Sequence, residues 1–315
     1  MVLGAELKSV ACEIIKLILL IVLSSLIIFF LISISPIDPI TSNYGQNLTS
    51  RMSSEKIADL QNYWGVGRPF FERFVLWFSN VLSGDFGQSL IYNEPVLNVI
   101  LRGLKNSAPI MFVSWLVSGV LGFTLGIFAS TKKNRISSVL KILNYCLIST
   151  PTYLIAILFL LFFSVALNWF PVSSNANFQG AILPCLVLTL FGIPTIFFHT
   201  LSKCDEVLKS DFVKHAEFKG LTQSQITKRH ILKNASFPFL SIEFAQIGEI
   251  IGGSVVVEQI LSYPGLGNTI IKAATSSDVC LLAGISFLTC VIVFLGNLIC
   301  KTITTKLDPR INNAK

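Results

Sequence analysis

The chain has 315 residues, of which 52% are hydrophobic and only 13% are charged, and its mean hydropathy is +0.70. This composition excludes an ordinary soluble domain and is typical of an all-α polytopic membrane protein. The seven cysteines form no CxxC pair and lie beside no histidine at metal-ligand spacing, so we interpret most of them as small apolar residues in helices and expect no metal site and no cofactor.

Six segments are apolar and long enough, at roughly 20 residues, to cross a bilayer core as helices. The first is too long for the apolar part of a signal peptide, and no small-residue cleavage site follows it. An uncharged stretch at residues 142–202 is too long for one helix, and "NWFPVSSNANFQG" interrupts it, so it predicts two spans. The six predicted spans are Leu17–Ser35, Ser107–Ser130, Ile142–Leu167, Ala181–Leu201, Phe237–Leu261 and Val279–Cys300.

Lysine and arginine predict the orientation of these spans. Residues 131–141 hold four of them, residues 202–236 hold seven, and the tail after the last span holds four. On the opposite side, residues 168–180 hold none and residues 262–278 hold only Lys272. Because basic loops stay in the cytoplasm, both termini are predicted to be cytoplasmic. The net charge of +7 is therefore interpreted as a topology signal and not as a nucleic-acid surface.

The spans divide the chain into four parts: a cytoplasmic N-terminus with the first span (1–35), an extracytoplasmic segment (36–106), a core of five helices that contains the loop 202–236 (107–303), and a cytoplasmic tail (304–315). Within the extracytoplasmic segment, Ser53–Gly65 predicts an amphipathic helix and Pro69–Gly84 a strongly aromatic one. Such aromatic residues often lie at headgroup depth, and the alternative is contact with a soluble binding protein.

The basic loop between the fourth and fifth spans carries signals for two short helices. Ser210 is a candidate N-cap, with Asp211 favourable in the first turn, and Gly220 suits the left-handed position that ends a helix. Thr222–Gln225 has the spacing of a capping box, which predicts a second helix over Gln223–Ala235.

The first of these short helices is expected to place Phe212, Val213 and Ala216 on one face. A simple charged loop that fixes the orientation of the chain is one interpretation. Such a loop needs charges only, whereas caps, a glycine stop and an apolar face are typical of a surface on which a soluble partner docks. Both interpretations remain open from the residues alone.

The fifth span contains three glutamates. Glu249 lies about 18 Å from the start of that span, near the middle of the bilayer, where an ionisable residue is costly and is a functional candidate. It is expected either to line a translocation pathway and favour a cationic solute, or to be protonated at a subunit interface. Gly252 and Gly253 allow close helix approach. Glu258 is expected at an outer gate or in a structural role, and Glu243 is expected to reach the cytoplasmic interface.

The loop also carries a longer motif. Residues 211–221 read DFVKHAEFKGL and residues 228–238 read KRHILKNASFP. This stretch resembles the "EAA" coupling loop of ABC importer permeases, in the form found in the peptide/nickel branch. Lys214, His215 and Glu217 differ from the usual residues of that form but leave the glycine and the spacing unchanged.

Further stretches along the chain are similar to motifs of the same branch, in the same order. The chain is therefore identified as a B-type permease of the oligopeptide, dipeptide and nickel importers, which depend on a solute-binding protein. The stretches are SPIDP (35–39), WGVGRPFFERFVLWFSNVLSGDFGQSL (64–90), VVVEQILSYPGLGNTI (255–270) and DPR (308–310).

The resemblance implies a multi-pass protein of the bacterial cytoplasmic membrane that imports peptides, nickel or metal chelates. It implies a second homologous permease, two cytoplasmic ATPases and an extracytoplasmic binding protein as partners. The chain has no GxxxxGK[ST] loop, so it is not expected to be an enzyme, and separate subunits are expected to hydrolyse ATP.

Two groups of site residues follow. The group expected to dock the ATPase is Asp211, Phe212, Lys214, His215, Ala216, Glu217, Gly220 and Leu221. The group expected to line the pathway or form a gate is Glu249, Gly252, Gly253, Glu258, Pro264 and Gly265.

Two other functions make different predictions about the sequence. A self-sufficient secondary transporter predicts an inverted repeat, and the sequence shows no clear repeat. An intramembrane enzyme predicts HExxH, GxSxG or paired intramembrane aspartates, and none of these occurs. The sequence leaves the solute and the identity of the partner subunits open.

Overall fold

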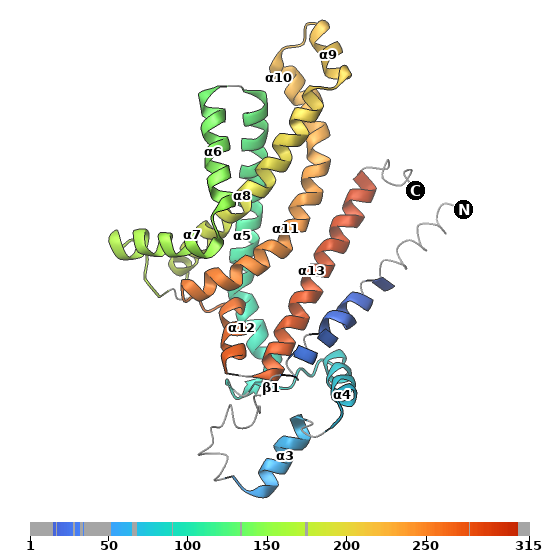
Figure 1. Ribbon diagram of the computed structural model, residues 1–315, viewed down its shortest axis with the longest axis vertical. Helices are drawn as coiled ribbons and strands as arrows, with labels where there is room; N and C mark the ends of the chain where they lie inside the picture. The colour runs from blue at the N-terminus through green and yellow to red at the C-terminus, as the bar shows by residue number, and fades with distance from the viewer. Residues whose placement is uncertain are drawn as a thin grey trace, which may run out of the picture. The chain divides into compact units, whose positions relative to one another are not determined.

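The computed structural model describes residues 15–16, 18–27, 29–31, 34, 52–64, 68–89, 91–132, 134–173, 176–276 and 278–307. Several predicted features lie wholly or partly outside these residues, namely parts of the first span and of the C-terminal tail, and the SPIDP and DPR motifs. The elements are α3 (Ser54–Trp64), α4 (Phe70–Leu82), β1 (Gln88–Ser89), β2 (Glu94–Pro95), α5 (Val96–Thr131), α6 (Arg135–Ser149), α7 (Thr152–Phe159), η1 (Leu160–Ala166), α8 (Phe178–Leu208), α9 (Asp211–Phe218), α10 (Gln223–Ile226), η2 (Thr227–Ile231), α11 (Leu232–Ile260), α12 (Leu266–Thr275) and α13 (Val279–Leu307) (Figure 1).

Within the described part of the chain, four helices are long and apolar enough to cross a membrane: Val96–Thr131, Phe178–Leu208, Pro238–Ile260 and Val279–Ile299. They overlap the second, fourth, fifth and sixth predicted spans, so the prediction of an all-α polytopic chain is confirmed in this coarser form. The described residues between Ile18 and Leu31 form a shorter apolar helix where the first span is predicted.

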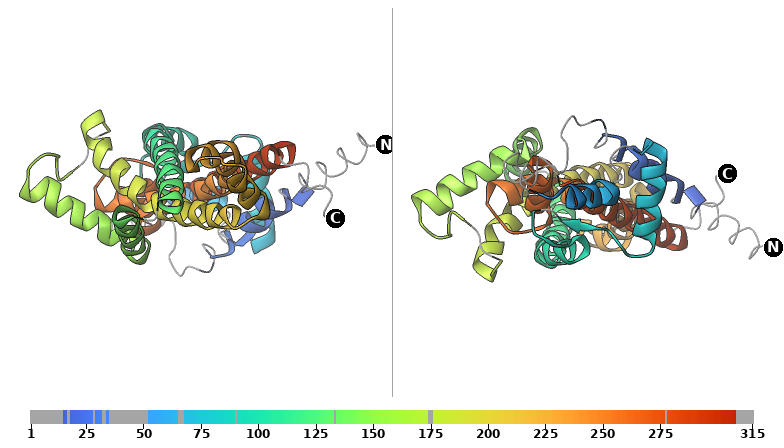
Figure 2. Two further views of the ribbon diagram at one scale, coloured as in Figure 1. Left: turned by 90° about the horizontal axis from the view of Figure 1, so that it is seen from above. Right: turned by 90° about the horizontal axis from the view of Figure 1, so that it is seen from below.

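The third predicted span, Ile142–Leu167, is not one straight helix. α6 and the run of α7 and η1 are bent by 104° at a short break, and Figure 2 shows α7 running across the direction of α6. Pro151 explains the break, because a proline disfavours the helical conformation for the residue before it. Thr150 accordingly has extended backbone angles, φ −97° and ψ 122°.

The chain forms two compact units, one of residues 1–106 and 265–294 and the other of residues 107–264 and 295–315. The first unit has a core where α12 and the start of α13 pack against the start of α5, through residues that include Val96, Ile100, Ala273 and Leu281. The two helices predicted within residues 36–106 are present as α3 and α4.

One aspartate joins distant parts of this first unit. β1 and β2 form a short antiparallel hairpin before α5. Asp278, fully buried at the start of α13, accepts hydrogen bonds through Oδ2 from the Ser89 hydroxyl (2.7 Å) and the Ile91 backbone N–H (3.2 Å). Its Oδ1 accepts from the Leu281 backbone N–H (3.1 Å), which caps the helix. The hairpin is thus tied to the beginning of α13.

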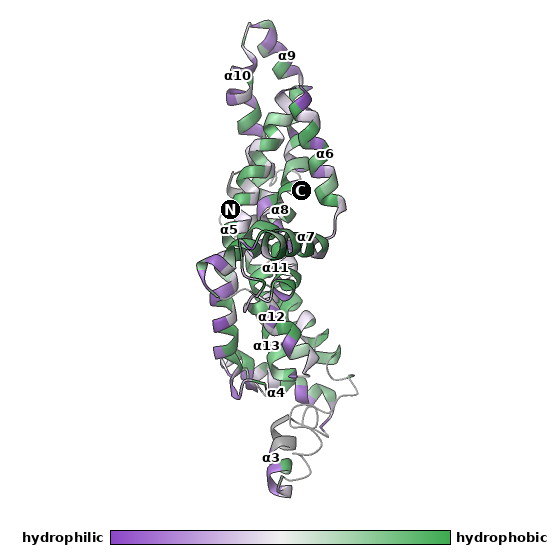
Figure 3. Cartoon of the chain, turned by 90° about the vertical axis from the view of Figure 1, so that its left-hand side faces the viewer, coloured by the Kyte–Doolittle hydropathy of each residue, from purple (hydrophilic) through white to green (hydrophobic). Residues whose placement is uncertain are grey.

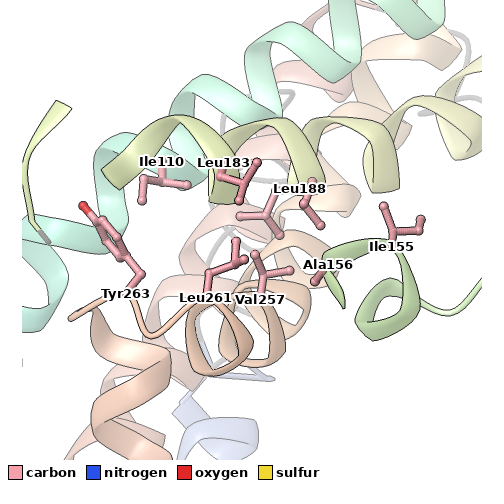
Figure 4. Packing of buried hydrophobic residues seen from close by; sticks show 9 residues of the cluster. Ile110, Ile155, Ala156, Leu183, Leu188, Val257, Leu261 and Tyr263 are labelled. Atoms are coloured by element: carbon pink, nitrogen blue, oxygen red, sulfur yellow. The ribbon is translucent and has the colours of Figure 1, made fainter. Parts of the chain in front are cut away.

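The second unit is built on the pair α8 and α11. In Figure 4, Leu183 and Leu188 of α8 face Val257 and Leu261 of α11, and Ala156 of α7 closes one side of this cluster. α5 also packs closely against α8, because Gly122 and Gly126 of α5 leave space for Ile196 and Thr200 of α8.

Candidate functional site

α9 and α10 form one end of the second unit, beyond α8 and α11 (Figure 1). α9 buries only Val213 and Ala216, which pack against a cluster from α8, α10, η2 and α11 that includes Cys204, Ile226 and Ile231. Figure 3 colours much of α9 and α10 as hydrophilic, in contrast to the apolar helices that carry them. The element is therefore anchored by a small apolar face and presents a polar outer surface.

Gly220 ends α9 as predicted. Its φ is +79°, in the left-handed region that favours glycine. The Gly220 N–H donates to the Glu217 carbonyl (2.9 Å) and the Leu221 N–H donates to the Ala216 carbonyl (3.2 Å). These are the two hydrogen bonds of a Schellman motif, and the half-buried Leu221 packs on the same apolar cluster. The angle between α9 and the next helix is thus set by the backbone.

The capping predictions have different outcomes. The capping box is confirmed: Thr222 caps α10, and its backbone N–H donates to Gln225 Oε1 (2.9 Å). Ser210 occupies the N-cap position of α9, as predicted, but its side chain makes no cap hydrogen bond, and its hydroxyl donates backwards to the carbonyl of Val207. The second helix also does not end near Ala235, because α10, η2 and α11 form one uninterrupted helical run.

The outer surface of α9 differs from the prediction at its aromatic residues. Phe212 was expected beside Val213 on the inner face, but it is 46% exposed and its ring lies 5.9 Å from the His230 ring. Phe218, which is not among the residues predicted to dock the ATPase, is 87% exposed. Its position five residues after the buried Val213, on the opposite side of the helix, is the signal that identifies it.

The charged predicted residues of α9 lie on this same surface. Asp211, Lys214, His215 and Glu217 are all exposed. Lys214 Nζ lies 2.9 Å from Asp211 Oδ1, and this hydrogen bond lowers the pKa of the Asp211 carboxyl. Together with Phe212 and Phe218, these residues give the element an exposed surface of aromatic rings and mixed charge.

The three glutamates of α11 have three different environments. Glu258 is fully buried, and its Oε1 accepts a hydrogen bond from the Ser107 hydroxyl (2.6 Å) on α5. Glu243 is also buried, at 4% exposure, which corrects the expectation that it reaches a membrane interface. Glu249 is exposed on the surface of this single chain. The sequence therefore predicts that this helix contains three glutamates, but it does not predict which of them are buried.

Glu249 belongs to an exposed stripe along α11. Most of its neighbours on that stripe are small or polar, with Val256 as the apolar member, whereas large apolar side chains such as Phe112, Leu116 and Ile142 are exposed on α5 and α6. A Cβ on Gly252 would meet nothing within 4 Å, whereas Gly253 faces Phe191 of α8 at 3.3 Å. The stripe comprises Ala245, Glu249, Gly252, Val256 and Gln259.

The remaining predicted pathway residues lie beyond the end of α11. Pro264 is exposed and ends the second unit, while Gly265 is buried, belongs to the first unit and precedes α12. Pro264 and Gly265 therefore belong to different units. Among the described residues, no group of three or more His, Cys, Asp or Glu side chains has a metal-binding arrangement.

Comparison with known proteins identifies relatives of the whole chain. A family described as "Binding-protein-dependent transport system inner membrane component" matches residues 122–313. The dipeptide transport system permease protein DppB of Lactococcus lactis subsp. cremoris (strain MG1363) is 26% identical, and the match covers 90% of this chain and 92% of the relative. The oligopeptide transport system permease protein AppB of Bacillus subtilis (strain 168) is 28% identical, with the same coverage of both chains.

A solved structure shares the fold. A chain of the inward-facing MetNI methionine ABC transporter matches with a TM-score of 0.56 at 16% identity, covering 67% of this chain and 97% of that one. The likeness extends the sequence comparison to the arrangement of the helices.

Proposed function

Because the chain belongs to the family of binding-protein-dependent transport system inner membrane components, and its relatives include dipeptide and oligopeptide permeases, we propose that it is the permease subunit of an ATP-driven importer. It forms half of the translocation pathway and docks a separate cytoplasmic ATPase through α9. The observation that carries this proposal is the exposed aromatic and charged surface of α9, a short helix whose position is fixed by its buried contacts and by the turn at Gly220.

The way in which α9 is attached to the longer helices is suited to transmitting movement. Val213 and Ala216 fix α9 to the ends of α8 and α11, and Gly220 fixes its angle to the next helix. Since α10, η2 and α11 are continuous from Gln223 to Ile260, a force on α9 is delivered to a helix that crosses the membrane. In this proposal the ATPase supplies ATP hydrolysis, and this chain converts closure of the ATPase into helix movement.

The proposal includes the full topology and the partners. The chain crosses the bacterial cytoplasmic membrane six times with both termini inside, and residues 36–106 lie outside. A second homologous permease, two ATPases and an extracytoplasmic binding protein complete the importer. The basic residues around α9, such as Lys219, Lys228 and Arg229, support its cytoplasmic placement.

The stripe that contains Glu249 and Gly252 supports a role for α11 in the pathway, because a carboxylate at that depth is stabilised by water, a cation or a polar partner and not by lipid. Glu249 therefore faces either the solute or the second permease. Peptides are the favoured solutes given the relatives, with nickel and metal chelates as the alternative, and Glu249 favours cationic cargo.

Co-purification from the cells that make the protein tests the proposal. The tagged chain is extracted in mild detergent, and its stoichiometric partners are identified by mass spectrometry. Three variants are compared: Phe218→Ala, Gly220→Val and Gly84→Val. Gly84 is the matched control, because it also has a positive φ (+85°) and open space around it but ends α4 in the first unit.

The wild type and the control are expected to bring down a second permease and ATPases. Phe218→Ala and Gly220→Val are expected to lose the ATPases and keep the second permease, since Phe218 is exposed and supports no core packing. A chain that is recovered alone would favour a self-sufficient secondary transporter. ATPases that remain bound to both α9 variants would contradict docking through this surface.

A further inference from the structure

Three helices of the second unit meet around two glycines. Glu243 and Gln246 lie one turn apart on α11 and are 4% and 1% exposed. The Glu243 carboxyl group lies on Gly119 of α5, where a Cβ would collide with three of its atoms. Gln246 Nε2 donates a hydrogen bond to the Gly192 carbonyl on α8 (2.6 Å). Two polar side chains of α11 thus occupy the space that glycine leaves on its neighbours.

The backbone around Glu243 is fixed, but one of its two carboxyl oxygens has no hydrogen-bond partner in the part of the chain that the structure describes. Trp115 Nε1 on α5 donates to the backbone carbonyl of Glu243 (2.6 Å). Within the described residues, Glu243 Oε2 and Gln246 Oε1 are buried and have no hydrogen-bond partner. An ionised carboxylate here would lose the hydration of Oε2 without gaining a hydrogen-bond donor to that atom, which disfavours the charged form.

The neighbouring elements offer few charges. α5 carries no ionisable side chain between Asn106 and Thr131. α13 packs on α11 where Gly296 meets Ile247. His199 and Glu249 are exposed. The ionisable residues closest in sequence to these contact points are Cys185 and His199 on α8, Lys233, Glu249 and Glu258 on α11, and Cys290 and Lys301 on α13.

We propose that Glu243 is a proton-binding site between α5 and α11: its carboxyl group is neutral while the two helices are packed, and its ionisation admits water and loosens the contact. The ligand is a proton, and the site depends on neither the solute nor the partner subunits. Because Glu243 lies on the helical run that begins after α9, protonation controls how firmly that run is held against α5.

Infrared spectroscopy of the purified full-length chain tests the protonation state directly. The wild type at neutral pH is expected to show a carbonyl-stretch band of a protonated carboxylic acid that Glu243→Gln lacks. Glu249→Gln is the matched control, since Glu249 is an exposed glutamate on the same helix, and it is expected to keep the band. Identical bands in the wild type and Glu243→Gln would mean that Glu243 is ionised at neutral pH, and would overturn the proposal.

Unfolding as a function of pH supplies a second readout. A carboxyl group that is neutral only when packed binds more protons in the folded state, so stability falls as pH rises, by up to about tenfold in the unfolding equilibrium constant per pH unit. Glu243→Gln is expected to be folded and to lack this dependence, whereas Glu249→Gln keeps it. A Glu243→Gln chain that fails to fold, or that keeps the wild-type dependence, would contradict the proposal, because glutamine has the size and neutrality of the protonated side chain.

Discussion

The α9 element and the buried face of α11 hold their polar residues by different means. In α9 the interactions are local: the Schellman hydrogen bonds at Gly220 and the capping box at Thr222 span only a few residues. On α11, Gln246 and Glu258 reach groups 54 and 151 residues away in sequence. Changes in α9 are therefore expected to have small effects on stability and large effects on docking, whereas changes facing α11 act on the fold itself.

The largest expected effect lies at the buried contact between α8 and α11. In Gly192→Leu, even the Cβ would lie 2.7 Å from Ser118 Oγ and 2.8 Å from Gln246 Nε2. We expect a loss of about 3 kcal/mol or more in the free energy of unfolding, measured by thermal or denaturant unfolding in detergent. Gly252→Leu is the control, because its Cβ meets nothing. Equal losses in both would show that the contact is not close-packed.

Removal of a buried carboxylate is expected to have the next largest effect. Glu258→Ala leaves the Ser107 hydroxyl without its acceptor and opens a cavity, so we expect a loss of about 2–4 kcal/mol in the free energy of unfolding. Glu249→Ala, on the exposed stripe of the same helix, is expected to change it by about 0.5 kcal/mol or less. A reversed order would contradict the assignment of these two faces of α11.

The capping box at Thr222 tests whether interactions within a few residues stabilise the short helices. Thr222→Ala removes the side-chain bond of the cap and is expected to destabilise the start of α10 by about 1 kcal/mol. Hydrogen exchange of the amides in α10 measures this effect. Ser210→Ala is the control, with a smaller expected effect because the Ser210 hydroxyl makes no cap hydrogen bond to α9. Equal effects would indicate that Ser210 caps α9 in solution.

The smallest effect concerns the exposed pair of Asp211 and Lys214. The pKa of Asp211 is lowered by its hydrogen bond to Lys214, so the favourable contribution of the pair is present above the ordinary pKa of a carboxyl group. It is lost as pH falls through the lowered pKa. Carbon NMR of the Asp211 carboxyl should show its pKa returning toward the ordinary value in Lys214→Ala. Lys219→Ala should leave it unchanged, and salt should weaken the shift.

These two regions also show how far the sequence could be interpreted. The glycine stop and the capping box were predictable because each is encoded within a few residues. The presence of Glu249 within a long apolar helix was predictable from the sequence, but the rotation of α11 was not. Which glutamate is buried depends on Gly119 and Ser107, which lie on α5 and carry no sequence signal that they face α11.

Two other errors have physical causes. Phe212 was placed on the inner face of α9 by its hydrophobicity, yet Val213 and Ala216 suffice to bury a helix of eight residues, so the ring is left outside. The bend in the third span was encoded in the sequence by Pro151, within an uninterrupted apolar run. Hydrophobicity averaged over a membrane-length window conceals a single break of this kind.

The hydrogen bonds that Asp278 accepts from the hairpin region have a consequence for biogenesis. Its hydrogen bond to Ser89 joins residues 189 positions apart, so the hairpin before α5 gains this contact only after nearly the whole chain has been synthesised. Contacts of such long sequence separation form late, because the intervening chain must first be ordered. A chain that stalls before α13 would leave the hairpin without its buried acceptor, which gives cellular quality control a means of distinguishing finished from unfinished molecules.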